Sequence, residues 1–231
     1  MQGISKALGS SFLRTYLFIV PALLSVAVIA PPFGSHVQSS FTAHMIQHIT
    51  LMMITGPLFV LATPSRWHPT NKLFTLLTHP ILSWLLYAAL MIGVHLPGPH
   101  DFIMMNSWAH DFIEVPLYLV IPYLFYFNLL DRNLTHRRIS PALSVISLFL
   151  MMVPETLTGF FIYVSNESLY KGMYSIDDQR RGGSFMWSGA MFIDVIWISF
   201  AVYHWIKSEE RKSIEVDAEI ARDAKAAKNA R

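Results

Sequence analysis

The stretch HMIQHITLMMITGPLF, residues 44–59, decides the fold class of this chain. It is apolar over most of its length, but two histidines, His44 and His48, stand near its start. A helix needs about 20 apolar residues to cross a bilayer, and the apolar run around this stretch covers residues 41–63. Because residues four apart share one helix face, we expect two imidazoles side by side at one end of a membrane span.

The composition of the whole chain also indicates a membrane protein. Hydrophobic residues make up 53% of its 231 residues, charged residues make up 14%, and the mean hydropathy is +0.42, whereas soluble domains carry about 25% charged residues. The net charge of +2 is too small to favour nucleic acid as a partner. There is no cysteine, which excludes disulfides, thiolate metal ligands and thiol catalysis.

Six apolar segments predict an all-α fold, a polytopic transmembrane helical bundle. The predicted spans lie near residues 13–31, 41–63, 76–97, 107–130, 141–164 and 184–206. They form one transmembrane domain, residues 1–206, followed by a charged tail, residues 207–231, that reads as a solvated helix or a disordered tail. The first segment resembles the core of a signal peptide, but the proline pair at 31–32 disfavours cleavage, and we expect a retained span.

The basic residues predict the orientation of the spans. Cytoplasmic loops are enriched in lysine and arginine, and all but three of the seventeen basic residues fall on the side of the two termini. The exceptions are Lys171, Arg180 and Arg181. We therefore expect both termini, including the tail, to be cytoplasmic.

Polar residues gather in the outer half of these spans. His44 and His48 open the second span, His95 ends the third, and His110 begins the fourth. Three acidic residues inside spans have a similar depth: Glu114, Glu155 and Asp194. An ionisable group in hydrocarbon costs about 2.5–3.5 kcal/mol or more, so such groups usually face the bundle interior and pair there. We expect one polar pocket that opens outward.

The residue types in this pocket favour a metal. Histidines at i and i+4 can chelate one ion, and histidine, methionine and carboxylate without thiolate favour copper, with zinc or iron as alternatives. The candidate ligands are His44, His48, His95 and His110. Candidates for additional ligands or supporting residues are Glu114, Glu155, Asp194 and Met45. In the simpler interpretation the methionines pack the core and the acids form hydrogen bonds between helices.

The segment SIDDQRRGGSFMW, residues 175–187, stands before the sixth span. Its acidic pair, Asp177 and Asp178, has two interpretations: a helix cap, or a carboxylate that folds over the pocket mouth. The pair Gly182 and Gly183 allows helices to approach closely.

Five pieces of the chain together resemble the integral-membrane CtaG-type cytochrome c oxidase assembly factors. They are HMIQHITLMMITGPLFVLATP at 44–64, HP at 79–80, HLP at 95–97, WAHDFIEVPLYLVIPYLFYF at 108–127 and DDQRRGGSFMWSGAMFIDVIW at 177–197. The resemblance implies a bacterial, multi-pass inner-membrane protein that supports copper delivery to haem–copper oxidases and catalyses no reaction. The implied partners are oxidase subunits or another copper chaperone, and a homo-oligomer stays open.

The resemblance also implies roles for single residues. His44 and His48 match the paired histidines of the family, His95 and His110 match single ones, and Asp178 and Gln179 match its DQ pair. Two features depart from the family. Glu114 stands where the family tends to have a second histidine, and six spans are expected where many relatives have seven.

Three other functions remain open at this stage. In a b-type haem protein, His48 and His110 would be axial ligands. A copper transporter would use the acids and methionines deep in the last two spans. A membrane desaturase or hydroxylase would need several histidine boxes, and only one HxxxH pattern is present.

Overall fold

A computed structural model describes residues 11–64, 71–130 and 139–229, and this part of the chain is helical without strands. The helices are α2 (Ser11–Ile29), α3 (Phe41–Ile49), α4 (Gly56–Ala62), α5 (Lys72–Leu77), α6 (Pro80–Gly93), α7 (Pro97–Met105), α8 (Ser107–Ala109), α9 (Val115–Leu130), α10 (Pro141–Val164), α11 (Ile176–Ser184) and α12 (Ala190–Asn229). A 3₁₀ turn, η1 (Gly34–His36), precedes α3. Three π-helical segments interrupt the long helices: η2 (Thr50–Thr55), η3 (His110–Glu114) and η4 (Phe185–Gly189).

Four helical rods are long and apolar enough to cross a membrane. They are Phe41–Ala62, Ser107–Leu130, Pro141–Val164 and Ile176–Asn229, and the bent pair α6 and α7 makes a fifth if it is counted as one span. The apolar part of α2, Thr15–Ile29, is shorter. The prediction of an all-α membrane protein is therefore confirmed with four or five spanning helices in the described residues, and the six-span topology stays a prediction.

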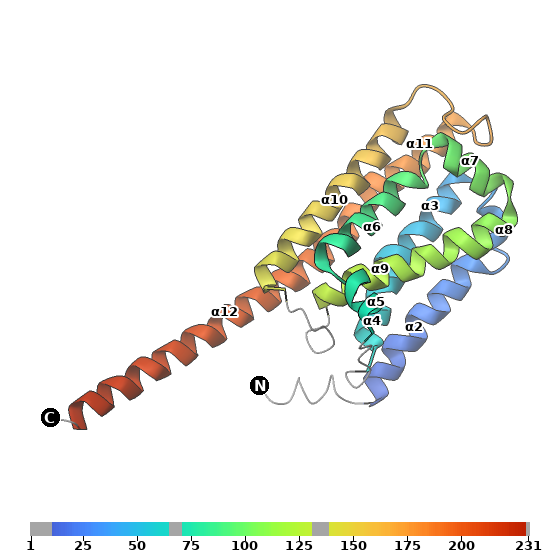
Figure 1. The fold of residues 1–231 in the computed structure, drawn as a ribbon. Helices are drawn as coiled ribbons and strands as arrows, with labels where there is room; N and C mark the ends of the chain where they lie inside the picture. The colour runs from blue at the N-terminus through green and yellow to red at the C-terminus, as the bar shows by residue number, and fades with distance from the viewer. Residues whose placement is uncertain (1–10, 65–70, 131–138, 230–231) are drawn as a thin grey trace.

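The third predicted span, residues 76–97, is wrong as one continuous helix. α5 ends at Leu77, and α6 runs only from Pro80 to Gly93. Each break ends at a proline. His79 precedes Pro80 and Leu96 precedes Pro97, and both residues adopt the extended backbone conformation that the ring of a following proline favours. The chain then turns by 76° into α7, which lies across one end of the bundle (Figure 1).

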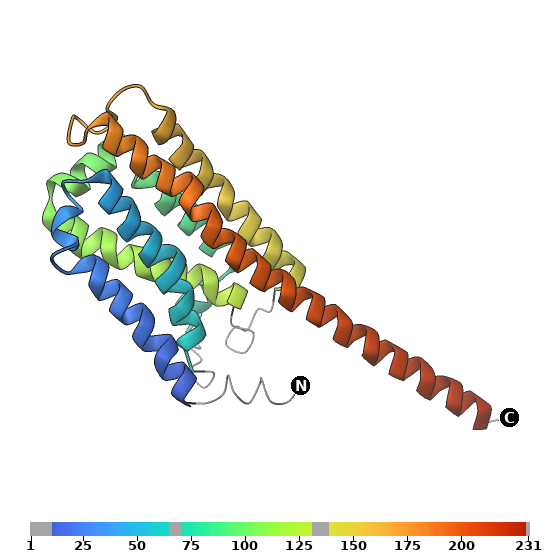
Figure 2. The same ribbon diagram turned by 180° about the vertical axis from the view of Figure 1, so that it is seen from behind.

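The sixth predicted span is part of a much longer rod. α11, η4 and α12 continue as one helical segment from Ile176 to Asn229. Figures 1 and 2 show α12 leaving the bundle at the end opposite α7. The tail predicted at 207–231 is thus helical up to Asn229, its side chains are exposed, and its last two residues lie outside the described part. The helical interpretation of the tail agrees with α12, and its place in the cytoplasm stays a prediction.

The rod formed by α3, η2 and α4 is the centre of the bundle. Two thirds of its apolar window, 67%, is buried, against 39% for α10 and 22% for the last rod. It packs against α2, α9 and α11. Fully buried methionines on this rod and its neighbours belong to the main hydrophobic core, as the simpler interpretation predicted: Met45, Met52, Met53, Met91, Met151 and Met186.

Glycines permit a close contact between α10 and the segment before α12. A Cβ atom on Gly159 would lie 2.6 Å from the backbone nitrogen of Trp187 and 3.0 Å from the carbonyl oxygen of Gly183. A Cβ atom on Gly183 would lie 2.7 Å from the nitrogen of Tyr163. The expected close approach at Gly183 is therefore observed, and its partner is Gly159.

We predict that Gly159→Ala destabilises the bundle. The added methyl group meets backbone atoms on the neighbouring helix, so the helices must separate, and we expect a loss of about 1–3 kcal/mol in the free energy of unfolding. Thermal unfolding of the purified protein measures it. Gly93→Ala is the matched control, since a Cβ there has no neighbour within 4 Å. Equal stability of the two variants would contradict the close approach.

Candidate metal centre

Five histidine rings meet near the α7 end of the bundle. The ring of His44 lies 5.2 Å from that of His100, between ring centroids, and 6.3, 6.4 and 6.5 Å from those of His95, His110 and His48. All five side chains are buried. The structure thus brings together the four predicted ligands and adds His100, and we call these five residues the histidine cluster.

The start of α3 fixes the positions of His44 and His48. Ser40 caps the helix by accepting a hydrogen bond from the nitrogen of Ala43. The carboxylate of Asp178 accepts hydrogen bonds from the nitrogen of Phe41 at 2.7 Å and from the hydroxyl of Thr42 at 2.6 Å. A carboxylate is stabilising at a helix N-terminus, where backbone N–H groups lack partners. Asp178 therefore connects α11 to α3: it caps the start of α3, whereas Ser175 caps the helix on which Asp178 itself lies.

Gln179 holds the loop that covers the cluster, residues 165–175. Its amide accepts a hydrogen bond from the nitrogen of Leu169 and donates one to the carbonyl of Glu167. From this loop, the Tyr170 ring packs 4.1 Å from that of His100, and its hydroxyl donates to the carbonyl of His95. Burial, with a smaller effect of Tyr174, raises the pKa of the Tyr170 hydroxyl, which therefore stays a donor. Tyrosines, and not an acidic side chain, cover this end of the cluster.

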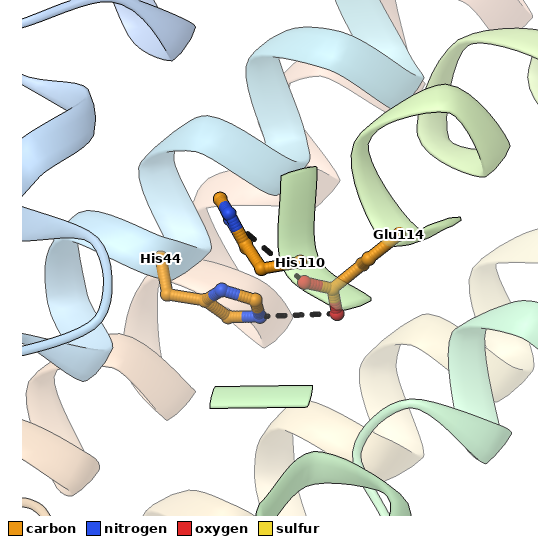
Figure 3. A group of neighbouring side chains, drawn as sticks. All are labelled: His44, His110 and Glu114. Atoms are coloured by element: carbon orange, nitrogen blue, oxygen red, sulfur yellow. Dashed lines mark ion pairs between the residues drawn. The ribbon is translucent and has the colours of Figure 1, made fainter. Parts of the chain in front are cut away.

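Glu114 is the carboxylate of the cluster. It follows His110 by four residues in the π-helical segment η3, a type of irregularity that is frequent at functional sites. Its two carboxylate oxygens lie 3.9 Å from Nε2 of His44 and 3.9 Å from Nε2 of His110 (Figure 3). One of these oxygens also accepts a hydrogen bond from the hydroxyl of Tyr118.

One ligand atom from each of His44, His110 and Glu114 lies within 4.8 Å of the other two. Metals bind imidazole nitrogen and carboxylate oxygen at about 2.0–2.2 Å, so ligand atoms of one ion lie within ~4.4 Å of each other. Small side-chain movements would therefore bring these three groups onto a single ion.

Hydrogen bonds distinguish His95 from His110. Nδ1 of His95 lies 2.5 Å from the carbonyl of Met91, so it carries the proton, and Nε2 keeps a lone pair without a partner. This arrangement orients metal-ligating histidines in many proteins. In contrast, Nδ1 of His110 faces Asp111, and Nε2 faces the amide oxygen of Gln47 at 3.0 Å. For Nε2 of His110 to bind a metal, its hydrogen bond to Gln47 must first break.

Several buried nitrogens of the cluster have no hydrogen-bond partner. They are both ring nitrogens of His44, both ring nitrogens of His48, Nε2 of His95 and Nδ1 of His100. A buried polar atom without a partner costs about 1–3 kcal/mol. Each of these rings offers a neutral nitrogen lone pair, which is the form that binds metals. The donor set thus fits a metal ion.

Three sequence-predicted residues lie away from the cluster. Glu155 accepts a hydrogen bond from the hydroxyl of Tyr87 at 2.9 Å, and its other described partner is Asp194. No described contact joins either acid to the histidines. Met45 is fully buried in the hydrophobic core.

His100 belongs to the cluster but was not among the ligands predicted from the sequence. A signal was present, because Pro97 and Pro99 follow His95 closely, and prolines turn a chain at the end of a helix. That turn carries His100 back over His44. Gln47 and Tyr118 were missed as well, although each stands one helical turn from a site residue.

Comparisons with known proteins give a family match. The family model described as Cytochrome c oxidase caa3 assembly factor (Caa3_CtaG) matches residues 5–208. An uncharacterized protein of Mycobacterium leprae (strain TN) is 23% identical over 213 residues, which is 78% of this chain and 32% of that protein. Uncharacterized proteins of Mycobacterium bovis and Mycobacterium tuberculosis are each 24% identical over 235 residues, which is 86% of this chain and 35% of theirs. The chain spans about a third of the length of these curated relatives. No solved structure matches it.

We predict that Asp178→Ala weakens the fold and leaves the metal ligands intact. Loss of the cap leaves buried N–H groups at the start of α3 without their acceptor, at a cost of about 0.5–2 kcal/mol in the free energy of unfolding. Thermal unfolding and metal stoichiometry at saturation measure the two effects. Asp177→Ala is the matched control, because Asp177 is the exposed neighbour in the same helical turn. Unchanged stability together with lost metal would instead make Asp178 a ligand.

Proposed function

This chain belongs to the family of cytochrome c oxidase caa3 assembly factors, whose model matches residues 5–208, and on that premise we propose that its histidine cluster holds copper for oxidase assembly. Proteins of an assembly family work with oxidase components, and their role is assembly, not catalysis. Copper is cargo in this function: it is bound at the cluster and passed to an oxidase subunit or to another copper chaperone.

The observation that carries the proposal is the set of buried imidazole nitrogens without partners on His44, His48 and His95. Nitrogen ligands with a nearby carboxylate and no thiolate suit copper among the metals that cells handle for oxidases. A bound ion would give each of these nitrogens a partner. His110 completes the four-histidine set once its hydrogen bond to Gln47 is released.

The packing around His48 supports an ion over a haem. Its ring centroid lies 5.1 Å from that of His95 and 4.6 Å from that of Tyr118, with edge-to-face geometry. A porphyrin bound through His48 would have to displace the rings of His95 and Tyr118. A metal ion needs only the small space between ring nitrogens.

We further propose six spans in the bacterial inner membrane, with both termini in the cytoplasm and the cluster in the outer half. Two observations support this orientation. The loop 165–175 and α7 lie at the end of the bundle opposite the projecting α12 (Figure 2). α12 carries six lysines and arginines, whereas the loop and α7 together carry one. An outward-facing cluster places copper on the side where the partner would receive it.

We predict that His44→Asn and His48→Asn reduce copper binding and leave the amount of membrane protein unchanged. Removing one of few ligands costs tenfold or more in affinity, the scale known even for residues around the ligands. Oxidase activity in cells should then fall most at low copper and recover in part with added copper, by mass action. The measurement is oxidase activity against medium copper, with copper content of the purified protein.

His36→Asn is the matched control for this pair, because His36 is exposed on η1 outside the cluster. Variants of His44 and His48 that behave like His36→Asn at every copper concentration would contradict the copper site. A visible absorption band of haem in the purified protein would contradict copper as the cargo at this position.

We predict that the two ends of the bundle react differently with an impermeant thiol reagent. The chain has no cysteine, so Ser107→Cys and Ser208→Cys each add a single thiol. Reagent added outside the cell should label position 107 and spare position 208 until the membrane is opened. The reverse pattern would overturn the orientation and place the histidine cluster on the cytoplasmic side.

A further inference from the structure

A second polar centre lies between α10 and α12. Glu155 and Asp194 are both buried, at 1% and 4% exposure, and their carboxyl groups lie within hydrogen-bonding range of each other. The contact of Gly159 with the segment before α12 lies one turn further along α10 and holds the two helices close at this level.

The pair is separate from the histidine cluster. Tyr87, which donates a hydrogen bond to Glu155, stands eight residues before His95 on the same stretch of chain. At 1.5 Å rise per residue that interval corresponds to about 12 Å along α6. The carboxyl pair therefore lies about two helical turns deeper in the bundle than the histidines.

The surroundings of the pair supply no positive charge. The described titratable side chains that face it are Tyr87 from α6 and Tyr126 from α9, in addition to the two acids from α10 and α12. No lysine, arginine or histidine of the described residues acts on it. Two adjacent carboxylates inside a bundle repel each other, so one of them is held neutral.

The hydrogen-bond inventory gives the same result. One oxygen of Glu155 accepts from Tyr87, and the other, Oε2, is buried without a donor. Carboxylates only accept hydrogen bonds, so two ionised groups cannot bond to each other, whereas a carboxylic acid can donate to a carboxylate. A single proton shared between Glu155 and Asp194 therefore allows a hydrogen bond that two carboxylates cannot form.

A metal cation fits this place less well. Hard cations take six or more oxygen ligands, and the described groups here are two carboxyls and tyrosine hydroxyls, one of which already donates its proton. We propose that Glu155 and Asp194 form a proton-binding site of this protein, distinct from the histidine cluster, that shares one proton between the two carboxyl groups at neutral pH.

The first test is the pH dependence of stability. In the folded wild type the pair keeps its proton, whereas carboxyls of the unfolded chain lose theirs above about pH 4–5. The pair therefore contributes its full free energy of stabilisation at low pH. This contribution decreases as the pH rises above the pKa of unfolded carboxyls, and the decrease ends where the folded pair releases its own proton. When the folded chain binds one proton more than the unfolded chain, Tm falls by about 3–5 °C per pH unit for a chain of this size.

The double variant Glu155→Gln with Asp194→Asn keeps two polar groups of the same shape that can bond to each other, and it has no proton to lose. We expect this part of the pH dependence to disappear in it. Each single variant should lose part of it, because the remaining buried carboxyl no longer has a second carboxylate beside it, and this keeps the test usable if the double variant does not fold. Asp177→Asn is the control, since Asp177 is exposed, and it should keep the wild-type profile.

The second test observes the proton directly. Infrared spectroscopy of the purified protein at neutral pH should show a protonated carboxyl band that shifts in D₂O and is absent from the double variant. Glu114→Gln must retain the band that the double variant loses, because Glu114 is a buried acid outside the pair. Three results would overturn the proposal. They are the absence of the band from the wild type, its loss in Glu114→Gln, and a bound cation that the wild type retains and the double variant lacks.

Discussion

The absence of water inside a bilayer governs this structure. Every polar group within a span must find its partner in the protein, because lipid offers none. The chain meets this constraint by turning its polar side chains toward the central rod of α3, η2 and α4. Gln47 illustrates it: from the middle of that rod it donates to the carbonyl of Val28 on α2 and accepts from His110 on η3. One amide thus ties three helices together and orients a histidine.

The same constraint explains what could be predicted from the sequence. Apolar length identified the spans around residues 41–63, 107–130 and 141–164, because hydrophobicity and helix length are local properties. Counting residues from the span ends placed His44, His48, His95 and His110 at one depth, and the structure brings them together. Depth along a helix is therefore readable from one sequence.

The direction in which each helix faces was not readable in the same way. Glu155 and Asp194 were expected at a depth similar to that of Glu114, yet they lie about two helical turns deeper and contact Tyr87 instead of the histidines. The role of Asp178 depends on a contact with Phe41 across 137 positions of sequence. His100 returns to the cluster through a 76° turn whose angle no local pattern specifies.

Charge is the remaining constraint on a metal in this bundle. A copper ion brings one or two positive charges into a region where an uncompensated charge is costly, and neutral imidazoles offset none of it. Glu114 is the buried acidic residue beside these histidines, at 3.9 Å from both His44 and His110, whereas Asp111, which contacts His110, is exposed. It stands where the resembling family tends to have another histidine. In our proposal, a carboxylate at this position replaces a neutral imidazole ligand. Its negative charge cancels one positive charge of the copper ion, so the ion and its site together approach neutrality.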